Sequence, residues 1–263
     1  MNLDTITPLI LTYNEEANIG RTLEKLTWAE RIVVVDSYST DATLNILEEY
    51  PQVEIFQREF DSHTVQWNFG LQQVDTEWAL SLDADYILSD ALVDEIRTLA
   101  LTPSVDGYHV SFIYCIFGTP LRASLYPSRL VLFRKEKGIY VQDGHTQRLE
   151  LGGSSETLAN PIYHDDRKPL GRWLQAQEQY ARREAEKLEN ASSLSHSLPD
   201  RLRRYCLAPI LTPLYCLFGK RLILDGRAGL YYTLQRTYAE LLLALYLLDE
   251  RLRGELSRKT SNS

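Results

Sequence analysis

The chain lacks several features that would assign it to a functional class at once. Its three cysteines, Cys115, Cys206 and Cys216, fit neither a disulfide framework nor a zinc site, which suggests a reducing compartment. Acidic residues outnumber basic ones by 36 to 28 and give a net charge of −8, so nucleic-acid binding is not expected. No basic segment followed by an apolar run opens the chain, and no signal peptide is expected.

Glycine-rich phosphate loops and long apolar runs are also missing. The pattern G-x-G-x-x-G does not follow the first strand-like run, and G-x-x-x-x-G-K-[ST] does not occur. Residues 205–219 carry no charge, but Pro209 and Pro213 interrupt them, and they are too few to span a bilayer. If the chain handles a phosphorylated ligand, it must cancel the ligand's charge by other means.

The first hundred residues alternate between apolar runs and segments with helical spacing. The strand-like runs are residues 6–13, 31–37, 52–57 and 77–83. The helical segments are residues 15–29, 39–50, 61–74 and 89–101. Four strand-helix units of this kind predict an α/β fold with a mostly parallel sheet and right-handed crossovers.

The pattern changes in the second half of the chain. Short strand-like runs divided by Gly and Pro fill residues 102–162 and predict a mixed or antiparallel extension of the sheet. A charged helical segment follows, then a linker at residues 190–200 and an apolar, aromatic final third. We therefore expect an α/β domain over residues 1–168 and a helical region over residues 169–263.

Acidic side chains follow two of the predicted parallel strands. Asp36 ends the second apolar run, and Asp83 and Asp85 end the fourth. Ligands of open parallel sheets bind at this edge, although each acid is also compatible with a helix cap or a solvated loop. Carboxylates alone would repel a diphosphate, whereas a divalent cation that they hold reverses the local charge.

Several stretches of the chain resemble the motifs of a known family. The stretches "LTYNEEANIGRTL", "VVVDSYSTDAT", "WNFGL" and "LSLDADY" are similar, in order and spacing, to the motifs of family 2 glycosyltransferases of the GT-A fold. "RLVLFR", "GHTQRL", "PIYHDD" and the C-terminal region resemble the subgroup near the lipopolysaccharide-core WaaE-type transferases. The resemblance implies inverting transfer from a nucleotide sugar, most simply UDP-linked, to a glycolipid or polysaccharide. It also implies Mg²⁺ or Mn²⁺ as cofactor, a nucleotide-sugar half at residues 1–100 and an acceptor half at residues 101–168.

The resemblance also implies roles for individual residues. The expected nucleotide-sugar-binding residues are Thr12, Tyr13, Asn14, Glu15, Asp36, Asn68, Asp83, Arg129 and Lys168. The expected metal ligands are Asp83, Asp85 and His164. Thr12 replaces a proline common in relatives, and Trp67 replaces a basic residue, so a cationic contact with the nucleotide is in doubt there. Trp67 is more simply read as a core residue.

A sugar hydroxyl needs a base to become an effective nucleophile. WaaE-type relatives tend to carry His-Glu in this region, where this chain has His145 and Thr146. We therefore expect Asp143 to be the base, with His145 as its orienting partner. The alternative is that Asp143 only starts a turn before Gly144.

The final third has two interpretations. Its tyrosines and basic residues suggest a platform on a membrane surface, which suits a lipid-linked acceptor. A helical layer packed on the domain, or the interface of a homo-oligomer, explains the same composition. The expected location is cytoplasmic, with or without attachment to the inner face of the cytoplasmic membrane. A nucleotide-sugar-binding module without turnover and a membrane-associated scaffold are the alternative functions.

Overall fold

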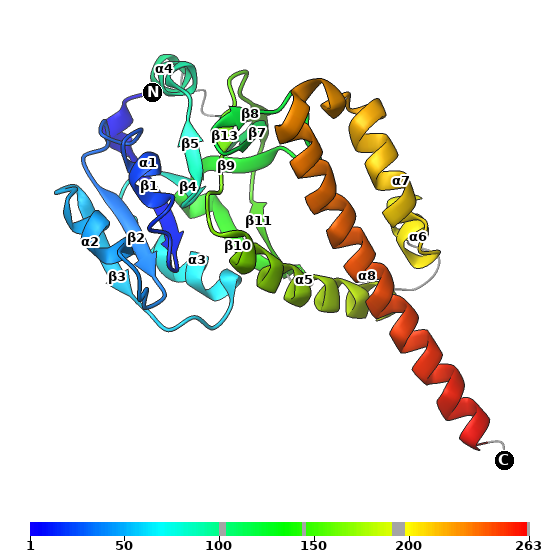
Figure 1. Ribbon diagram of the computed structural model, residues 1–263. Helices are drawn as coiled ribbons and strands as arrows, with labels where there is room; N and C mark the ends of the chain where they lie inside the picture. The colour runs from blue at the N-terminus through cyan, green and yellow to red at the C-terminus, as the bar shows by residue number, and fades with distance from the viewer. Residues whose placement is uncertain (100–103, 144–145, 191–197, 262–263) are drawn as a thin grey trace. The chain divides into compact units, whose positions relative to one another are not determined.

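The computed structural model describes the backbone of residues 1–99, 104–143, 146–190 and 198–261. These residues form two compact units (Figure 1). The first unit contains residues 1–120 and 125–168. The second contains residues 121–124 and 169–263.

A seven-stranded sheet lies at the centre of the first unit. Its strands run in the order β12-β6-β9-β4-β1-β2-β3. Their bounds are β1 Ile6–Thr12, β2 Ile32–Asp36, β3 Val53–Gln57, β4 Trp78–Asp83, β6 Gly107–Val110, β9 Arg129–Arg134 and β12 Ser155–Thr157. Strands β1 to β4 are parallel, and β9 pairs with β4 in the antiparallel direction. The register places Asp36 opposite Thr12 and Asp83 opposite Leu11, so the predicted acids reach one edge of the sheet.

Helices connect the parallel strands β1 to β4: α1 Ile19–Leu23, α2 Thr43–Glu48 and α3 His63–Gln73. Helix α4 Asp90–Thr98 follows the end of β4. Ser62 and Ser89 begin α3 and α4, because each hydroxyl accepts a hydrogen bond from a first-turn N–H. Helix α1 is much shorter than predicted. After Leu23 the chain continues in turns closed by hydrogen bonds from an N–H to the carbonyl three residues earlier. Leu26 is still buried, as its apolar spacing indicated.

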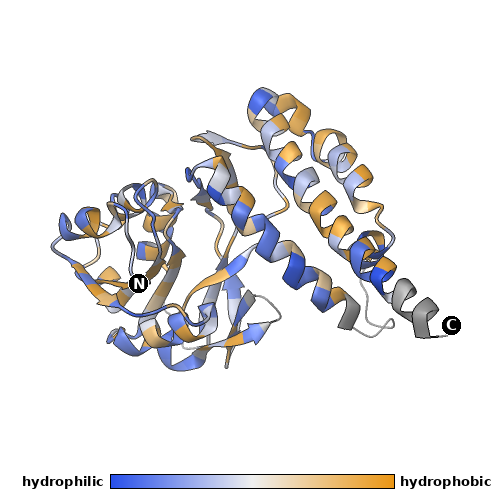
Figure 2. Cartoon of the chain, turned by 60° about the horizontal axis from the view of Figure 1, so that its bottom comes forward, coloured by the Kyte–Doolittle hydropathy of each residue, from blue (hydrophilic) through white to orange (hydrophobic). Residues whose placement is uncertain are grey.

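Both faces of the sheet are buried, as expected for parallel strands. Val34 points into a core that includes side chains of α1, α2 and α4. Val33 and Val35 point into a second core with α3 and Tyr140. Tyr140 belongs to a hairpin of β10 Gly138–Asp143 and β11 Thr146–Leu151. The strands are accordingly apolar along much of their length (Figure 2).

A second, smaller sheet meets the end of β4. Its order is β5-β13-β7-β8, with bounds β5 Tyr86–Leu88, β13 Ile162–His164, β7 Phe112–Ile116 and β8 Thr119–Pro120. Strand β5 begins directly after Asp85, and β13 ends in His164. Their antiparallel pairing sets His164 opposite Tyr86, which brings His164 next to the aspartate pair.

The second unit is helical. Its elements are α5 Leu170–Asn190, α6 Leu198–Arg204, α7 Ala208–Leu214, the π-turn η3 Tyr215–Gly219, the 3-10 turn η4 Leu222–Asp225 and α8 Gly226–Ser261. Buried Ala185 of α5 packs with Leu247 of α8, and Arg203 binds Glu240 at 2.8 Å. Over the described residues, no helix combines the length and apolar character needed to cross a membrane.

Candidate active site

The loops after β1 and β2 are tied together by side chains that accept backbone hydrogen bonds. Asn14 adopts a left-handed backbone with φ 55°, which asparagine tolerates better than most residues. Its Oδ1 accepts the N–H of Thr40 at 2.6 Å, and Ser39 Oγ accepts the N–H of Asn14 at 2.8 Å. Thr43 Oγ1 accepts the N–H of Glu15 at 2.6 Å. These hydrogen bonds fix the two loops relative to each other at the edge of the sheet.

Asp36 lies beneath these loops and is 0% exposed. One carboxylate oxygen accepts a hydrogen bond from Thr12 Oγ1 at 3.0 Å, and the other accepts the N–H of Ser39 at 2.9 Å. Gln57 Nε2 donates to the second oxygen at 3.4 Å. The carboxylate therefore stabilises the loops from inside, and its predicted contact with a nucleotide stays a prediction.

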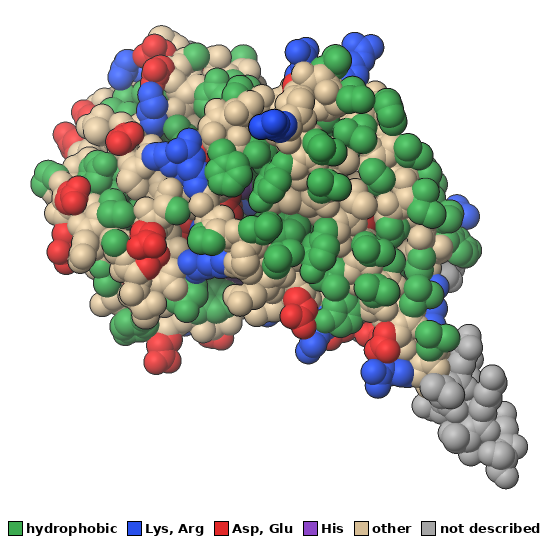
Figure 3. All heavy atoms as spheres, in the orientation of Figure 1, with side chains coloured by type: hydrophobic (Ala, Val, Ile, Leu, Met, Phe, Trp, Pro, Cys, Tyr) green, Lys and Arg blue, Asp and Glu red, His purple; other side chains and the backbone are tan. Residues whose placement is uncertain are grey.

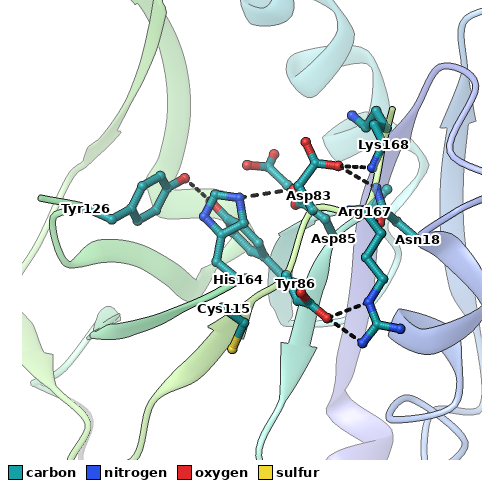
Figure 4. Close-up of polar contacts among 12 residues, drawn as sticks. Asn18, Asp83, Asp85, Tyr86, Cys115, Tyr126, His164, Arg167 and Lys168 are labelled. Carbon is teal, nitrogen blue, oxygen red and sulfur yellow. Dashed lines mark hydrogen bonds and ion pairs between the residues drawn. The ribbon is translucent and has the colours of Figure 1, made fainter. Parts of the chain in front are cut away.

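Asp83 and Asp85 lie differently, at the end of β4. The Asp83 side chain is 41% exposed, and its Oδ2 lies 3.9 Å from Nη1 of Arg129. Asp85 is nearly buried, and its Oδ2 lies 3.0 Å from Nε2 of His164 (Figure 4). Thr22 Oγ1 donates to the carbonyl of Ala84 at 2.7 Å, which fixes the backbone between the two carboxylates.

His164 is enclosed by tyrosine rings. The centroid of its ring lies 5.3, 4.7 and 4.6 Å from those of Tyr86, Tyr114 and Tyr126. The hydroxyls of Tyr86 and Tyr126 are 2.5 Å apart. Burial lowers the pKa of His164, but the charge and hydrogen bond of Asp85, together with the charges of Asp83 and Asp166, outweigh burial and raise that pKa. The contact between His164 and Asp85 restricts the orientation of this carboxylate.

Glu15 and Lys168 form an ion pair beside the aspartates. Lys168 Nζ lies 2.6 Å from Glu15 Oε1, and Asn18 Nδ2 donates to the other oxygen at 2.9 Å. Burial raises the pKa of Glu15 to about 7, against the opposing effect of Lys168 and with support from the charge of Asp85. A carboxyl that ionises near neutrality here makes the charge next to Lys168 sensitive to pH.

The segment after β13 is locked to the start of α1. Arg21 Nη1 lies 2.7 Å from Oδ2 of Asp165, and Arg167 Nε donates to the same oxygen at 2.8 Å. Asn18 Oδ1 accepts the N–H of Arg167 at 2.9 Å. These contacts fix the backbone that leads to Lys168.

Other predicted residues have different surroundings. Asn68 makes two hydrogen bonds with the backbone of Tyr140, at 2.8 and 3.0 Å, and thereby joins α3 to β10. Trp67 is buried and stacks on Tyr140, as expected of a core residue. Tyr13 is half exposed. Asp143 ends β10, but its side chain, like all of His145, lies outside the described residues.

The cluster combines carboxylate oxygens with cations on one edge. Within the described ranges, no group of three or more His, Cys, Asp or Glu side chains is arranged to hold a metal ion. Magnesium, however, is commonly bound by one or two carboxylates together with substrate phosphates. The partly exposed oxygens of Asp83, beside Asp85 and near Arg129, fit that second kind of site.

Five residues of this cluster were not predicted from the sequence. Asn18 and Arg21 come from α1 and its start, and Tyr86, Tyr114 and Tyr126 surround His164. Tyr86 could have been predicted, since it directly follows Asp85 in a strand-like run. The other four act through contacts with residues more than 35 positions away, and no local pattern indicates them.

Comparison with known proteins gives matches of two kinds. Residues 9–153 match the family described as glycosyl transferase family 2. The lipopolysaccharide core biosynthesis glycosyltransferase LpsC of Rhizobium meliloti (strain 1021) is 30% identical over 111 residues, which are 40% of this chain and 41% of that protein. An uncharacterized glycosyltransferase of Rickettsia bellii (strain RML369-C) is 33% identical over 104 residues, 39% of this chain and 35% of that protein. The matches thus span about two fifths or less of these relatives' length.

A solved structure extends the similarity of fold along nearly the whole chain. The mannosyltransferase PcManGT from Pyrobaculum calidifontis superposes with a TM-score of 0.54 at 16% identity, and covers 94% of this chain and 87% of its own. At that identity the likeness concerns the fold, and it confirms the predicted GT-A architecture. The family match covers more than half of the 263 residues and includes the ends of β1, β2 and β4. The chain belongs to glycosyltransferase family 2.

Proposed function

We propose that this glycosyltransferase takes its sugar from a nucleoside diphosphate donor bound at the carboxyl ends of β1 and β4. One observation carries the proposal: two aspartates with different exposure lie next to Arg129 and the Glu15–Lys168 pair. Carboxylates with nearby cations suit a diphosphate that arrives with a divalent ion. We favour a UDP-linked donor because the motifs of the first hundred residues resemble those of family 2 glycosyltransferases.

The metal site of this proposal consists of Asp83 and Asp85. Carboxylate oxygens are the ligands that Mg²⁺ and Mn²⁺ prefer. PcManGT was solved in complex with GDP-Man and Mn²⁺, which supports a divalent ion here. When bound, such an ion would stabilise the charge of the departing diphosphate. His164 is predicted as a third ligand, and its bond to Asp85 also supports the role of orienting that carboxylate.

Chain residues supply the remaining charge and orientation. The proposed partners of the phosphate oxygens are Lys168 and Arg129, whose guanidinium lies 4.8 Å from the ring centroid of Tyr126. Lys168 already binds Glu15, so a phosphate would compete with this carboxylate. Protonation of Glu15, whose pKa is about 7, would release Lys168 for the donor.

The proposed reaction is a single displacement. Asp143 removes the proton of the acceptor hydroxyl while that oxygen bonds to the anomeric carbon. The bond from the anomeric carbon to the diphosphate breaks in the same step, and the nucleoside diphosphate leaves with its electron pair. One base on the face opposite the leaving group gives inversion. His145 is the proposed partner of Asp143, and both assignments rest on the sequence.

The proposed acceptor is a glycolipid or polysaccharide of the cell envelope. The support is the name of LpsC, a lipopolysaccharide core biosynthesis glycosyltransferase that matches two fifths of this chain. The residues that select an acceptor are expected in the second half of the first unit, at residues 101–168.

A donor screen tests the proposal. The intact protein is incubated with UDP- and GDP-sugars and with Mn²⁺ or Mg²⁺, and nucleotide release and binding heats are measured. We expect metal-dependent binding of at least one nucleotide sugar, with slow hydrolysis when no acceptor is present. Binding without turnover even with envelope glycolipid extracts would favour a nucleotide-sugar-binding module. No binding in any combination would contradict the proposal.

The base assignment has its own test. Asp143→Asn should lower the turnover number about 100-fold or more, because general bases contribute that much, and leave donor affinity unchanged. Glu150→Gln, an exposed carboxylate on the paired strand, is the matched control and should retain turnover. Wild-type turnover in Asp143→Asn would show that another group takes the proton.

A further inference from the structure

Helix α8 carries two apolar stripes, and only one is covered within its own unit. Leu243 and Leu247 are buried and pack with α5. A second stripe consists of Leu230, Leu234, Leu241, Leu245, Leu248 and Leu252, each between 41% and 59% exposed. Their spacings of three, four and seven residues set them on one side of the helix. The stripe extends over about 33 Å at 1.5 Å per residue.

Helix α7 and the π-turn η3 add a parallel stripe. Ile210, Leu214 and Phe218 are 64%, 52% and 62% exposed, and they also recur every four residues. Helices α7 and α8 pack along each other. Figure 3 shows their hydrophobic side chains gathered on a single broad face. An apolar face of this size on a surface normally marks a binding site.

Basic residues outnumber acids along this face. Residues 205–253 contain six basic residues and four acids, although the whole chain carries a net charge of −8. Of these acids, Glu240 is buried against Arg203, and Asp249 beside Leu248 is paired with Arg253. Asp225 is nearly buried and binds Arg122 at 2.9 Å. Arg221 and Arg227 are exposed next to the equally exposed Ile223 and Leu224.

Tyrosines complete the pattern. Tyr205 and Tyr215 are 70% and 52% exposed, and Lys220 lies 5.7 Å from the ring of Tyr215. A ring with a polar hydroxyl suits a boundary between an apolar and an aqueous phase.

We propose that the face formed by α7, η3, η4 and one side of α8 binds the surface of an anionic lipid bilayer. The leucines and Phe218 would enter the boundary between headgroups and acyl chains, and Lys220, Arg221 and Arg227 would meet the anionic headgroups. The chain would lie on the bilayer, in keeping with the finding that no helix in the described ranges is long and apolar enough to span it. This inference concerns the second unit and does not depend on the proposed reaction.

Charge distinguishes this occupant from a second copy of the chain. Two such faces brought together would bring Lys220, Arg221 and Arg227 of one copy close to those of the other, and the nearby acids Asp225 and Asp249 are already paired with Arg122 and Arg253. Like charges opposed across an interface are unfavourable. An anionic lipid surface complements both the apolar stripes and their basic margin.

Vesicle flotation of the full chain tests the proposal. Vesicles of phosphatidylcholine with and without phosphatidylglycerol are compared at physiological salt, and circular dichroism verifies the fold of each variant. The wild type should float with the anionic vesicles. Leu234→Ser/Leu241→Ser/Leu245→Ser should lower the partition coefficient at least tenfold, because three apolar contacts are lost. The matched control Phe60→Ser/Val65→Ser/Ile139→Ser replaces exposed apolar residues of the first unit and should float like the wild type.

A second pair of variants tests the charge. Arg221→Gln/Arg227→Gln should weaken binding to anionic vesicles by about fivefold for each charge, while Lys135→Gln/Lys137→Gln should not. A wild type that stays with neither kind of vesicle would overturn the proposal, and so would a leucine variant that floats normally. A wild-type dimer in light scattering that the leucine changes dissociate, with flotation unaffected, would assign the face to a second copy instead.

Discussion

The carboxyl ends of β2 and β4 look alike in sequence and differ in the folded chain. Each strand is mostly apolar and ends in an aspartate, Asp36 or Asp83. Asp36 is 0% exposed, and its oxygens accept hydrogen bonds from Thr12, Ser39 and Gln57. Asp83 is 41% exposed and has Arg129 at 3.9 Å.

The difference in exposure suggests that Asp36 stabilises the loops of the site, whereas Asp83 can contact a ligand. A buried carboxylate with its hydrogen bonds satisfied contributes mainly to the stability of the loops that it joins. A partly exposed carboxylate beside a cation has oxygens available to a metal or a sugar. The same isosteric change, aspartate to asparagine, should therefore have opposite consequences at the two positions.

Asp83→Asn should produce the largest effect. We expect glycosyl transfer, or donor hydrolysis, to fall roughly 100-fold or more, because a carboxylate oxygen of the proposed metal site is replaced by an amide. The free energy of unfolding should change by less than about 0.5 kcal/mol, because the side chain is partly exposed. Steady-state kinetics and urea unfolding measure the two quantities.

Asp94→Asn is the matched control, since Asp94 is an exposed aspartate on α4 paired with Arg97. Transfer by this variant should equal that of the wild type. Normal transfer by Asp83→Asn as well would place the metal site elsewhere.

Glu15→Gln should remove a pH dependence of stability. The pKa of Glu15 is raised from 4.5 to about 7, so the folded chain binds this proton more tightly than the unfolded chain. Its contribution to stability is complete below pH 4.5 and is lost as the pH rises through about 7, an effect of up to about 3 kcal/mol. Urea unfolding at pH 5 and pH 7.5 should show a smaller difference for Glu15→Gln. Equal differences in the two proteins would mean that Glu15 titrates normally.

Asp36→Asn should mainly destabilise the fold. The new amide group would face hydrogen-bond donors in a buried position, at a cost of about 1–3 kcal/mol in urea unfolding. Below the unfolding transition the donor should bind with nearly unchanged affinity. Unchanged stability with a large loss of donor affinity would instead establish direct contact between Asp36 and the nucleotide.

Asn14→Ala should produce the smallest effect. Alanine is less stable than asparagine in the left-handed backbone at φ 55°, and it cannot accept the hydrogen bond from the N–H of Thr40. The free energy of unfolding should therefore fall by about 1–2 kcal/mol. Asn14→Gly, which keeps the backbone conformation accessible, should lose less. Equal losses in thermal or urea unfolding would show that the side-chain bonds alone account for the effect.

The parallel sheet was predictable because its signals are local. Apolar runs such as β2 and serine caps such as Ser62 depend on neighbouring residues. The length of α1 was not predictable, because the apolar period of Ile19, Leu23 and Leu26 is compatible with both a helix and successive turns. The small sheet could not be predicted for a different reason, since β5 and β13 are 3 residues each and pair across more than 70 positions.

The candidate site was partly predictable for the same reason. A strand-end pattern identifies Asp83 and Asp85, yet it does not distinguish them from Asp36. That distinction comes from Thr12, 24 residues earlier, and from a loop whose conformation only the fold determines. The Glu15–Lys168 pair joins residues 153 positions apart, and no spacing rule indicates it.

Anomalous diffraction from crystals containing Mn²⁺ and a nucleoside diphosphate tests the central claim most directly. We expect a manganese peak within about 2.5 Å of a carboxylate oxygen of Asp83 or Asp85, with the diphosphate on its far side. A peak bound elsewhere, or a nucleotide bound at saturation with no metal near these aspartates, would contradict it.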